Sequence, residues 1–128
     1  MKILIVEDSA RERRDLKTLL EMGGHKIIEA TYRNEAFEFI QKDEFDLIIT
    51  DLYMPKGNWE KDKLHARSGI EIVHEAKAFA KPGTRIWLTS ADLTDEIRTE
   101  ALRGGAEKVV DKGIPLFKAL QTAGIIPS

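Results

Sequence analysis

The sequence predicts an α/β fold in which a parallel sheet is covered by helices on both faces. Five short apolar runs alternate along the chain with stretches whose apolar residues recur at helical spacing. Three of these runs are unbroken and rich in isoleucine, leucine and valine, as in strands that are buried on both faces. The connections between the elements are short, and such an alternation favours parallel strands. We therefore expect the element order βαβαβαβαβα.

The individual elements are indicated by their apolar runs and by the residues that start or stop the helices. Ser9, with Glu12 three residues later, matches a capping box at the start of the first helix, which ends at Gly23. Thr94 opens the fourth helix, and Pro115 suits the first turn of the fifth. The expected strands are residues 3–6, 26–28, 47–49, 86–88 and 109–110.

The composition limits the kind of protein this can be. A chain of 128 residues fits one domain, and it contains no cysteine, which excludes a disulfide framework, a thiolate metal site and a cysteine nucleophile. The net charge of −2 supplies no basic surface for direct nucleic-acid binding. The first apolar run is too short for a signal peptide, and no segment approaches the roughly 20 apolar residues that span a bilayer. We expect a cytoplasmic protein.

Polar residues follow four of the expected strands at their carboxyl ends. In open α/β sheets, ligands bind along this edge. The carboxylates of Glu7, Asp8 and Asp51 would repel one another there unless a cation lies among them, and an all-oxygen set of ligands suits Mg²⁺. A carboxylate can also attack phosphorus to form an aspartyl phosphate, while a lysine and a hydroxyl can bind the phosphoryl oxygens. The polar residues at this edge are Glu7, Asp8, Asp51, Thr89, Ser90, Asp111 and Lys112.

Several motifs, in the order in which they occur, resemble the receiver domain of two-component response regulators. The resemblance covers almost the whole chain. It implies a flavodoxin-like (βα)5 fold, with a doubly wound, five-stranded parallel sheet in the strand order 2-1-3-4-5. It also implies a single receiver domain over residues 1–128, without an output domain. The matching segments are Ile3–Asp8, Gly24–Ala30, Asp46–Pro55, Gly69–Val73 and Gly104–Ala106.

The resemblance further implies a role for each polar residue at this edge. Asp51 is expected to accept a phosphoryl group, and Lys112 to pair with Asp51 or with its phosphate. Glu7, Asp8, Asp51 and the backbone carbonyl of Tyr53 are expected to bind Mg²⁺. The simpler alternatives are that Asp8 caps the first helix, that Asp51 ends a strand and that Lys112 is a solvated surface residue.

The family also has a switch hydroxyl, which we assign to Ser90. Ser90 and Ala91 match the Thr/Ser–Ala pair of the family, and Lys112 follows 22 residues after Ser90, the separation that the resemblance implies. Thr89 stays open as the alternative.

Three positions near this edge depart from the family pattern. Gly113 follows Lys112 where receivers usually have proline, often after a cis peptide bond, so a more flexible loop is expected. Val109 replaces the usual Tyr or Phe whose ring responds to the switch hydroxyl, so output is expected to run through backbone shifts of the fourth helix and its loop. Tyr53 overlooks the phosphoacceptor, where its phenol can screen attacking water while Asp92 can orient that water.

A fourth departure is an extended loop over residues 56–68. Gly69 lies 14 residues after Pro55, and in most receivers the spacing is about four, so the loop is long for a βα connection. Trp59 within it is either an exposed recognition residue or a packing anchor in a tolerated insertion. The loop is basic, with Lys56, Lys61, Lys63 and Arg67 against Glu60 and Asp62.

These observations favour a receiver that takes a phosphoryl group from a histidine kinase or phosphotransfer protein and then changes its contacts with a downstream protein. Such a protein acts on its own side chain and is not a conventional enzyme; we expect a monomer or a phosphorylation-dependent dimer. The alternative is a pseudo-receiver that is not phosphorylated and binds proteins constitutively. A phosphatase-type hydrolase is a third hypothesis, but the first strand lacks the second aspartate, two residues on, that such enzymes usually have.

Overall fold

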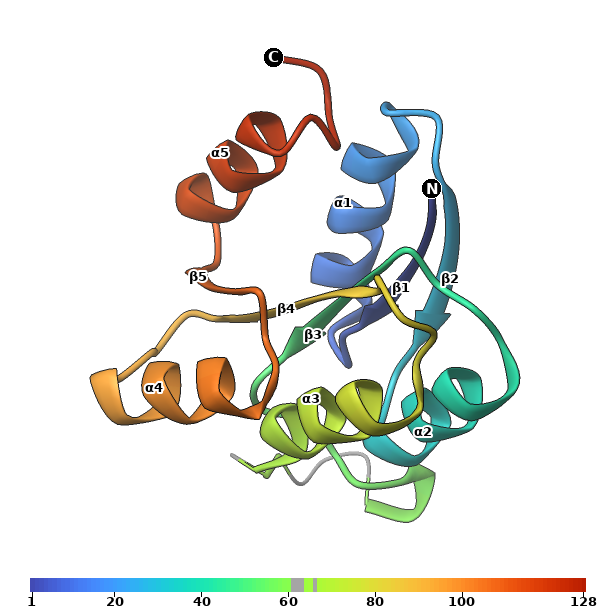
Figure 1. The fold of residues 1–128 in the computed structure, drawn as a ribbon, viewed down its shortest axis with the longest axis vertical. Helices are drawn as coiled ribbons and strands as arrows, with labels where there is room; N and C mark the ends of the chain where they lie inside the picture. The colour runs from blue at the N-terminus through green and yellow to red at the C-terminus, as the bar shows by residue number, and fades with distance from the viewer. Residues whose placement is uncertain (61–63, 66) are drawn as a thin grey trace.

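The computed structural model describes residues 1–60, 64–65 and 67–128, which contain one five-stranded parallel sheet (Figure 1). The strand order is β2-β1-β3-β4-β5, and each strand contains the apolar run predicted for it. The predicted fold class and strand order are therefore confirmed. The strands are β1 (Lys2–Val6), β2 (Lys26–Ala30), β3 (Leu47–Asp51), β4 (Arg85–Ser90) and β5 (Lys108–Asp111).

Helices cover both faces of this sheet, as Figure 1 shows. The first and last helices share one face, and the three middle helices share the other. A short 3-10 turn, η1 (Asn58–Glu60), lies between β3 and the third helix. The helices are α1 (Ala10–Glu21), α2 (Arg33–Lys42), α3 (Ser68–Phe79), α4 (Asp95–Gly104) and α5 (Ile114–Thr122).

Alternate side chains of each strand enter two separate cores. Ile5 and Ile49 pack with Leu20 of α1 and Leu120 of α5 on one face of the sheet. Their neighbours, such as Ile48, pack under α2, α3 and α4 on the other face. Because both faces are covered, every position of β3 is buried, which explains its unbroken apolar run. Each fully buried Ile or Leu contributes roughly 1.5–3 kcal/mol.

The capping box predicted at the start of α1 is only half formed. The Ser9 hydroxyl accepts a hydrogen bond from the Glu12 amide at 3.3 Å, as expected. In a complete capping box the Ser9 amide would donate to the Glu12 carboxylate. Here that amide donates instead to Glu7 Oε2, at 3.0 Å. Glu12 is therefore free of its expected capping role.

The extended loop after β3 is attached to the body of the domain at its start. The carbonyl of Pro55 accepts from the Arg33 amide at 2.9 Å at the beginning of α2, and Met54 forms an isolated antiparallel bridge with His65. Trp59 is 73% exposed, and its ring covers Gly57. Residues 61–63 and 66 lie outside the described residues, so the predicted basic set is described only at Lys56 and Arg67.

In the described part of the chain, no helix combines the length and the apolar character needed to cross a membrane.

Candidate functional site

Asp51 lies at the carboxyl end of β3, in the middle of the sheet. Asp51 pairs in register with Thr89 of β4, and the preceding residue, Thr50, pairs with Val6 of β1. One carboxylate oxygen, Oδ1, accepts a hydrogen bond from the Leu52 amide at 2.7 Å. The other, Oδ2, lies 3.0 Å from Lys112 Nζ. The residue is only 7% exposed. The carboxylate is therefore buried, and the Leu52 amide and the Lys112 ammonium hold it in place.

Glu7 and Asp8 approach Asp51 because β1 and β3 are neighbours and both end at the same edge. One carboxylate oxygen from each of these three residues lies within 4.8 Å of the other two. Glu7 is buried and Asp8 is partly buried. Three oxygen donors at this separation fit a hard divalent cation such as Mg²⁺, which takes few protein ligands and keeps several waters.

Lys112 enters the same cluster from the loop after β5. Its ammonium lies 2.9 Å from Glu7 Oε1 and 3.0 Å from Asp51 Oδ2. A third carboxylate, that of Glu12 on α1, lies 3.2 Å away. The sequence interpretation missed Glu12, because the Ser9–Glu12 spacing assigned it to the helix cap. The structure thus brings Glu7, Asp51 and Lys112 together and adds Glu12.

Burial and crowding of like charges control protonation in this cluster. Burial raises the pKa of Asp51 to about 6, and the neighbouring Glu7 charge adds to that effect. Burial likewise raises the pKa of Glu7. Burial opposes the charged form of Lys112, but its hydrogen bond to Glu7 and the charge of Asp51 outweigh this and raise its pKa. Lys112 is therefore a permanent cation facing carboxylates that are costly to ionise.

The two hydroxyls at the end of β4 lie in different surroundings. The Ser90 hydroxyl is buried and accepts a hydrogen bond from the Asp92 amide at 3.2 Å, at the start of the loop to α4. The Thr89 hydroxyl is also buried and has no hydrogen-bond partner among the described residues. Tyr53 is half-buried against the core under α3. The roles assigned to Ser90 and to the Tyr53 carbonyl stay predictions.

A family model described as "Response regulator receiver domain" matches residues 3–123. The chain belongs to this family. Receiver domains are signalling modules, and this match confirms the resemblance drawn from the motifs.

The chain is similar to parts of larger regulatory and sensor proteins, and it spans only a small share of the length of the first of these relatives. It is 26% identical over 125 residues to a sensory/regulatory protein, RpfC, of Xanthomonas campestris, covering 95% of the chain but 16% of that protein. It is 35% identical over 83 residues to a chemotaxis protein CheY homolog of Campylobacter jejuni, covering 63% of the chain and 56% of that protein. Among solved structures, chemotaxis protein CheY4 of Vibrio cholerae is 28% identical, with a TM-score of 0.75 covering 94% of this chain and 96% of that one.

The departure at Val109 is accompanied by an arginine contact that the sequence did not indicate. Val109 is buried in the core beneath α4. Arg98 of α4 donates a hydrogen bond to the Val109 carbonyl and lies 3.9 Å from Asp111. This receiver therefore connects α4 to β5 through Arg98.

The Lys112–Gly113 peptide bond is trans, and Gly113 adopts a φ of +87°, which few other residues adopt.

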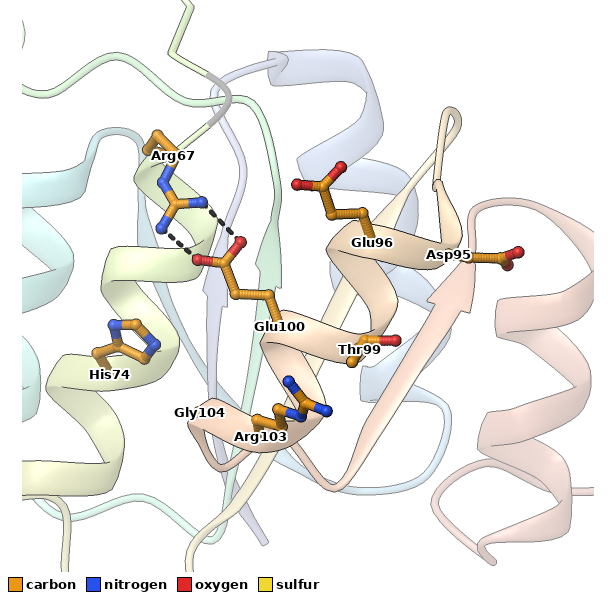
Figure 2. Close-up of a pocket in the computed structure, with 8 residues that line it drawn as sticks. All are labelled: Arg67, His74, Asp95, Glu96, Thr99, Glu100, Arg103 and Gly104. Carbon is orange, nitrogen blue, oxygen red and sulfur yellow. Dashed lines mark hydrogen bonds and ion pairs between the residues drawn. The ribbon is translucent and has the colours of Figure 1, made fainter.

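A second arginine connects the extended loop to α4 across an open groove between α3 and α4 (Figure 2). Arg67, just before α3, points toward Glu100 and donates two hydrogen bonds to its carboxylate. This pairing lowers the pKa of Glu100. The end of the extended loop and α4 are thus joined by a bidentate ion pair.

Proposed function

We propose that this receiver domain accepts a phosphoryl group on Asp51, from a phosphohistidine of a histidine kinase or phosphotransfer protein. The observation that carries the proposal is the position of the Asp51 carboxylate. It is buried at the central edge of the sheet, within 4.8 Å of oxygens from Glu7 and Asp8, and 3.0 Å from the ammonium of Lys112.

Glu7, Asp8 and Asp51 are the residues that would hold Mg²⁺, with the Tyr53 carbonyl as a further ligand. When bound, the ion neutralises negative charge on the phosphoryl oxygens. Asp51 attacks phosphorus with a carboxylate oxygen, so that an O–P bond forms while the N–P bond to the donor imidazole breaks. Once the phosphoryl group is in place, Lys112 pairs with one of its oxygens, since the flexible stem of the lysine lets its ammonium reach the Asp51 side chain.

Ser90 transmits the change to α4 in this proposal. Its hydroxyl now accepts from the Asp92 amide. A turn toward the phosphoryl group gives up that bond and releases the loop that precedes α4. The surface around α4 then changes its contacts with a downstream protein, which is a shift between two states and not turnover of a substrate. The complete set of Glu7, Asp8, Asp51 and Lys112 supports this function over that of a constitutive binding module.

The test is labelling of the full chain by a small phosphodonor, read by intact mass, with and without Mg²⁺. We expect the addition of one phosphoryl group, dependent on Mg²⁺ and lost in Asp51→Asn. Asp15→Asn is the matched control, because it removes an exposed carboxylate from α1 outside the cluster. An unlabelled but folded wild-type protein, or equal labelling of Asp51→Asn, contradicts the proposal.

A further inference from the structure

We propose that Glu12 is a positioning residue that holds Lys112 away from Glu7 and Asp51 when a cation occupies the acidic cluster. The inference rests on the function proposed above. It concerns a carboxylate outside the predicted set of metal ligands.

The first step is a conflict between Lys112 and a cation. The ammonium now bonds to Glu7 Oε1 at 2.9 Å and to Asp51 Oδ2 at 3.0 Å. These two carboxylates also belong to the cluster of oxygens that fits a divalent ion. A positive ion placed among them repels the ammonium and competes for the same oxygens. Lys112 therefore has to loosen its contacts with Glu7 and Asp51 when the cluster is loaded.

The second step is that Glu12 offers the ammonium another partner. Both of its carboxylate oxygens are close to Lys112 Nζ, at 3.2 and 3.3 Å. Its side chain is 50% exposed at the rim, whereas those of Glu7 and Asp51 are buried. A shift toward Glu12 keeps the ammonium paired without placing it against the cation.

The third step is that Glu12 and Lys112 are available for this exchange. Glu12 has no reciprocal bond to the Ser9 amide, because Glu7 accepts from that amide. The Lys112 backbone stays fixed through its amide, which donates to the Ser90 carbonyl at 3.0 Å. The movement is then confined to the flexible stem of the lysine.

Loss of Glu12 leaves Lys112 paired with Glu7 and Asp51, where it competes with Mg²⁺. An ion pair of this exposure is worth up to about 1 kcal/mol, which converts to a loss of about two- to five-fold in Mg²⁺ affinity. Removing one negative charge near the cluster also weakens Mg²⁺ binding through its long-range field alone. The experiment therefore has to separate this field effect from the effect that passes through Lys112.

The experiment is a Mg²⁺ titration of the full chain by calorimetry, with Glu12→Gln, Lys112→Met and the double variant. Glu12→Gln weakens binding about two- to five-fold, and Lys112→Met strengthens it by removing the competitor. In the Lys112→Met background, Glu12→Gln has no further effect, because its action passes through the lysine. Asp15→Asn, which removes the same charge from the same helix, leaves the affinity nearly unchanged.

Two results overturn the inference. One is an equal loss from Glu12→Gln with and without Lys112, which indicates a long-range field. The other is unchanged affinity in a folded Glu12→Gln protein. A wild-type protein that binds no Mg²⁺ contradicts the proposed function itself, so the two failures are distinguishable.

Discussion

Asp51→Asn is expected to stabilise the metal-free protein at neutral pH, although it removes the proposed phosphoacceptor. Burial and the nearby Glu7 raise the pKa of Asp51 from 3.8 to about 6. The folded state therefore holds a proton that the unfolded state has already lost in this range. The free energy of unfolding consequently falls as the pH rises between these two values, and the ionised carboxylate is a full penalty at pH 7.

The size of the effect follows from the pKa difference. One pKa unit corresponds to about 1.4 kcal/mol, so a rise of about two units costs the folded protein roughly 3 kcal/mol once Asp51 is ionised. Asparagine keeps the acceptor for the Leu52 amide but gives up the ion pair with Lys112, which retains Glu7 and Glu12. We expect a net gain of about 1–3 kcal/mol.

The assay is urea denaturation in a chelating buffer at about pH 5 and about pH 7.5. Wild type should lose more stability than Asp51→Asn between the two, and Asp15→Asn should behave like wild type. Lower stability of Asp51→Asn than of wild type at about pH 7.5, where Asp51 is ionised, would refute the reasoning, because it would mean that the Lys112 pair outweighs the burial penalty.

Three further predictions concern packing and polar contacts elsewhere. Gly69→Ala adds a Cβ that collides with the backbone at the end of β3, and it should lower the free energy of unfolding in urea by about 1–3 kcal/mol. The Cβ added by the control Gly104→Ala comes closest to the exposed side chain of His74, which can move, so the free energy of unfolding should change by less than about 1 kcal/mol. Thr94→Ala removes the hydroxyl that caps α4 and should cost about 1 kcal/mol in urea unfolding, with Thr94→Ser as the conservative control. A double-mutant cycle on Arg67 and Glu100, read by urea unfolding, should give a coupling of about 0.2–1 kcal/mol at low salt that disappears in high salt. Strict additivity of the two substitutions at low salt would contradict a stabilising ion pair.

The fold could be predicted because its signals are local and repeated. Burial on both faces makes β3 a nearly continuous apolar run. Thr94 caps the start of α4, and Gly105, with a φ of +119°, ends it. The approach of Glu7, Asp8 and Asp51 follows as well, since parallel strands end at one edge.

The contacts that the sequence could not indicate depend on long side chains that cross between elements. Glu12 has a local capping pattern, and nothing in that pattern shows that a lysine 100 residues away competes for its carboxylate. In the sequence, Arg67 and Arg98 look like solvent-exposed arginines. The packing of α4 brings Glu100 to Arg67, and it brings Arg98 to the Val109 carbonyl. Partner choice for a flexible arginine is decided by tertiary geometry, which no spacing rule encodes.

The Arg98 contact has a consequence for behaviour at high concentration. β5 has a neighbour on one side only, and an open strand edge is a template for pairing with another chain. Arg98 occupies the Val109 carbonyl and adds a charge beside it, while β2 at the opposite edge carries the charged Lys26 and Glu29. Both ends of the sheet thus discourage strand-to-strand aggregation, and Arg98→Ala is expected to lower the concentration at which the protein precipitates.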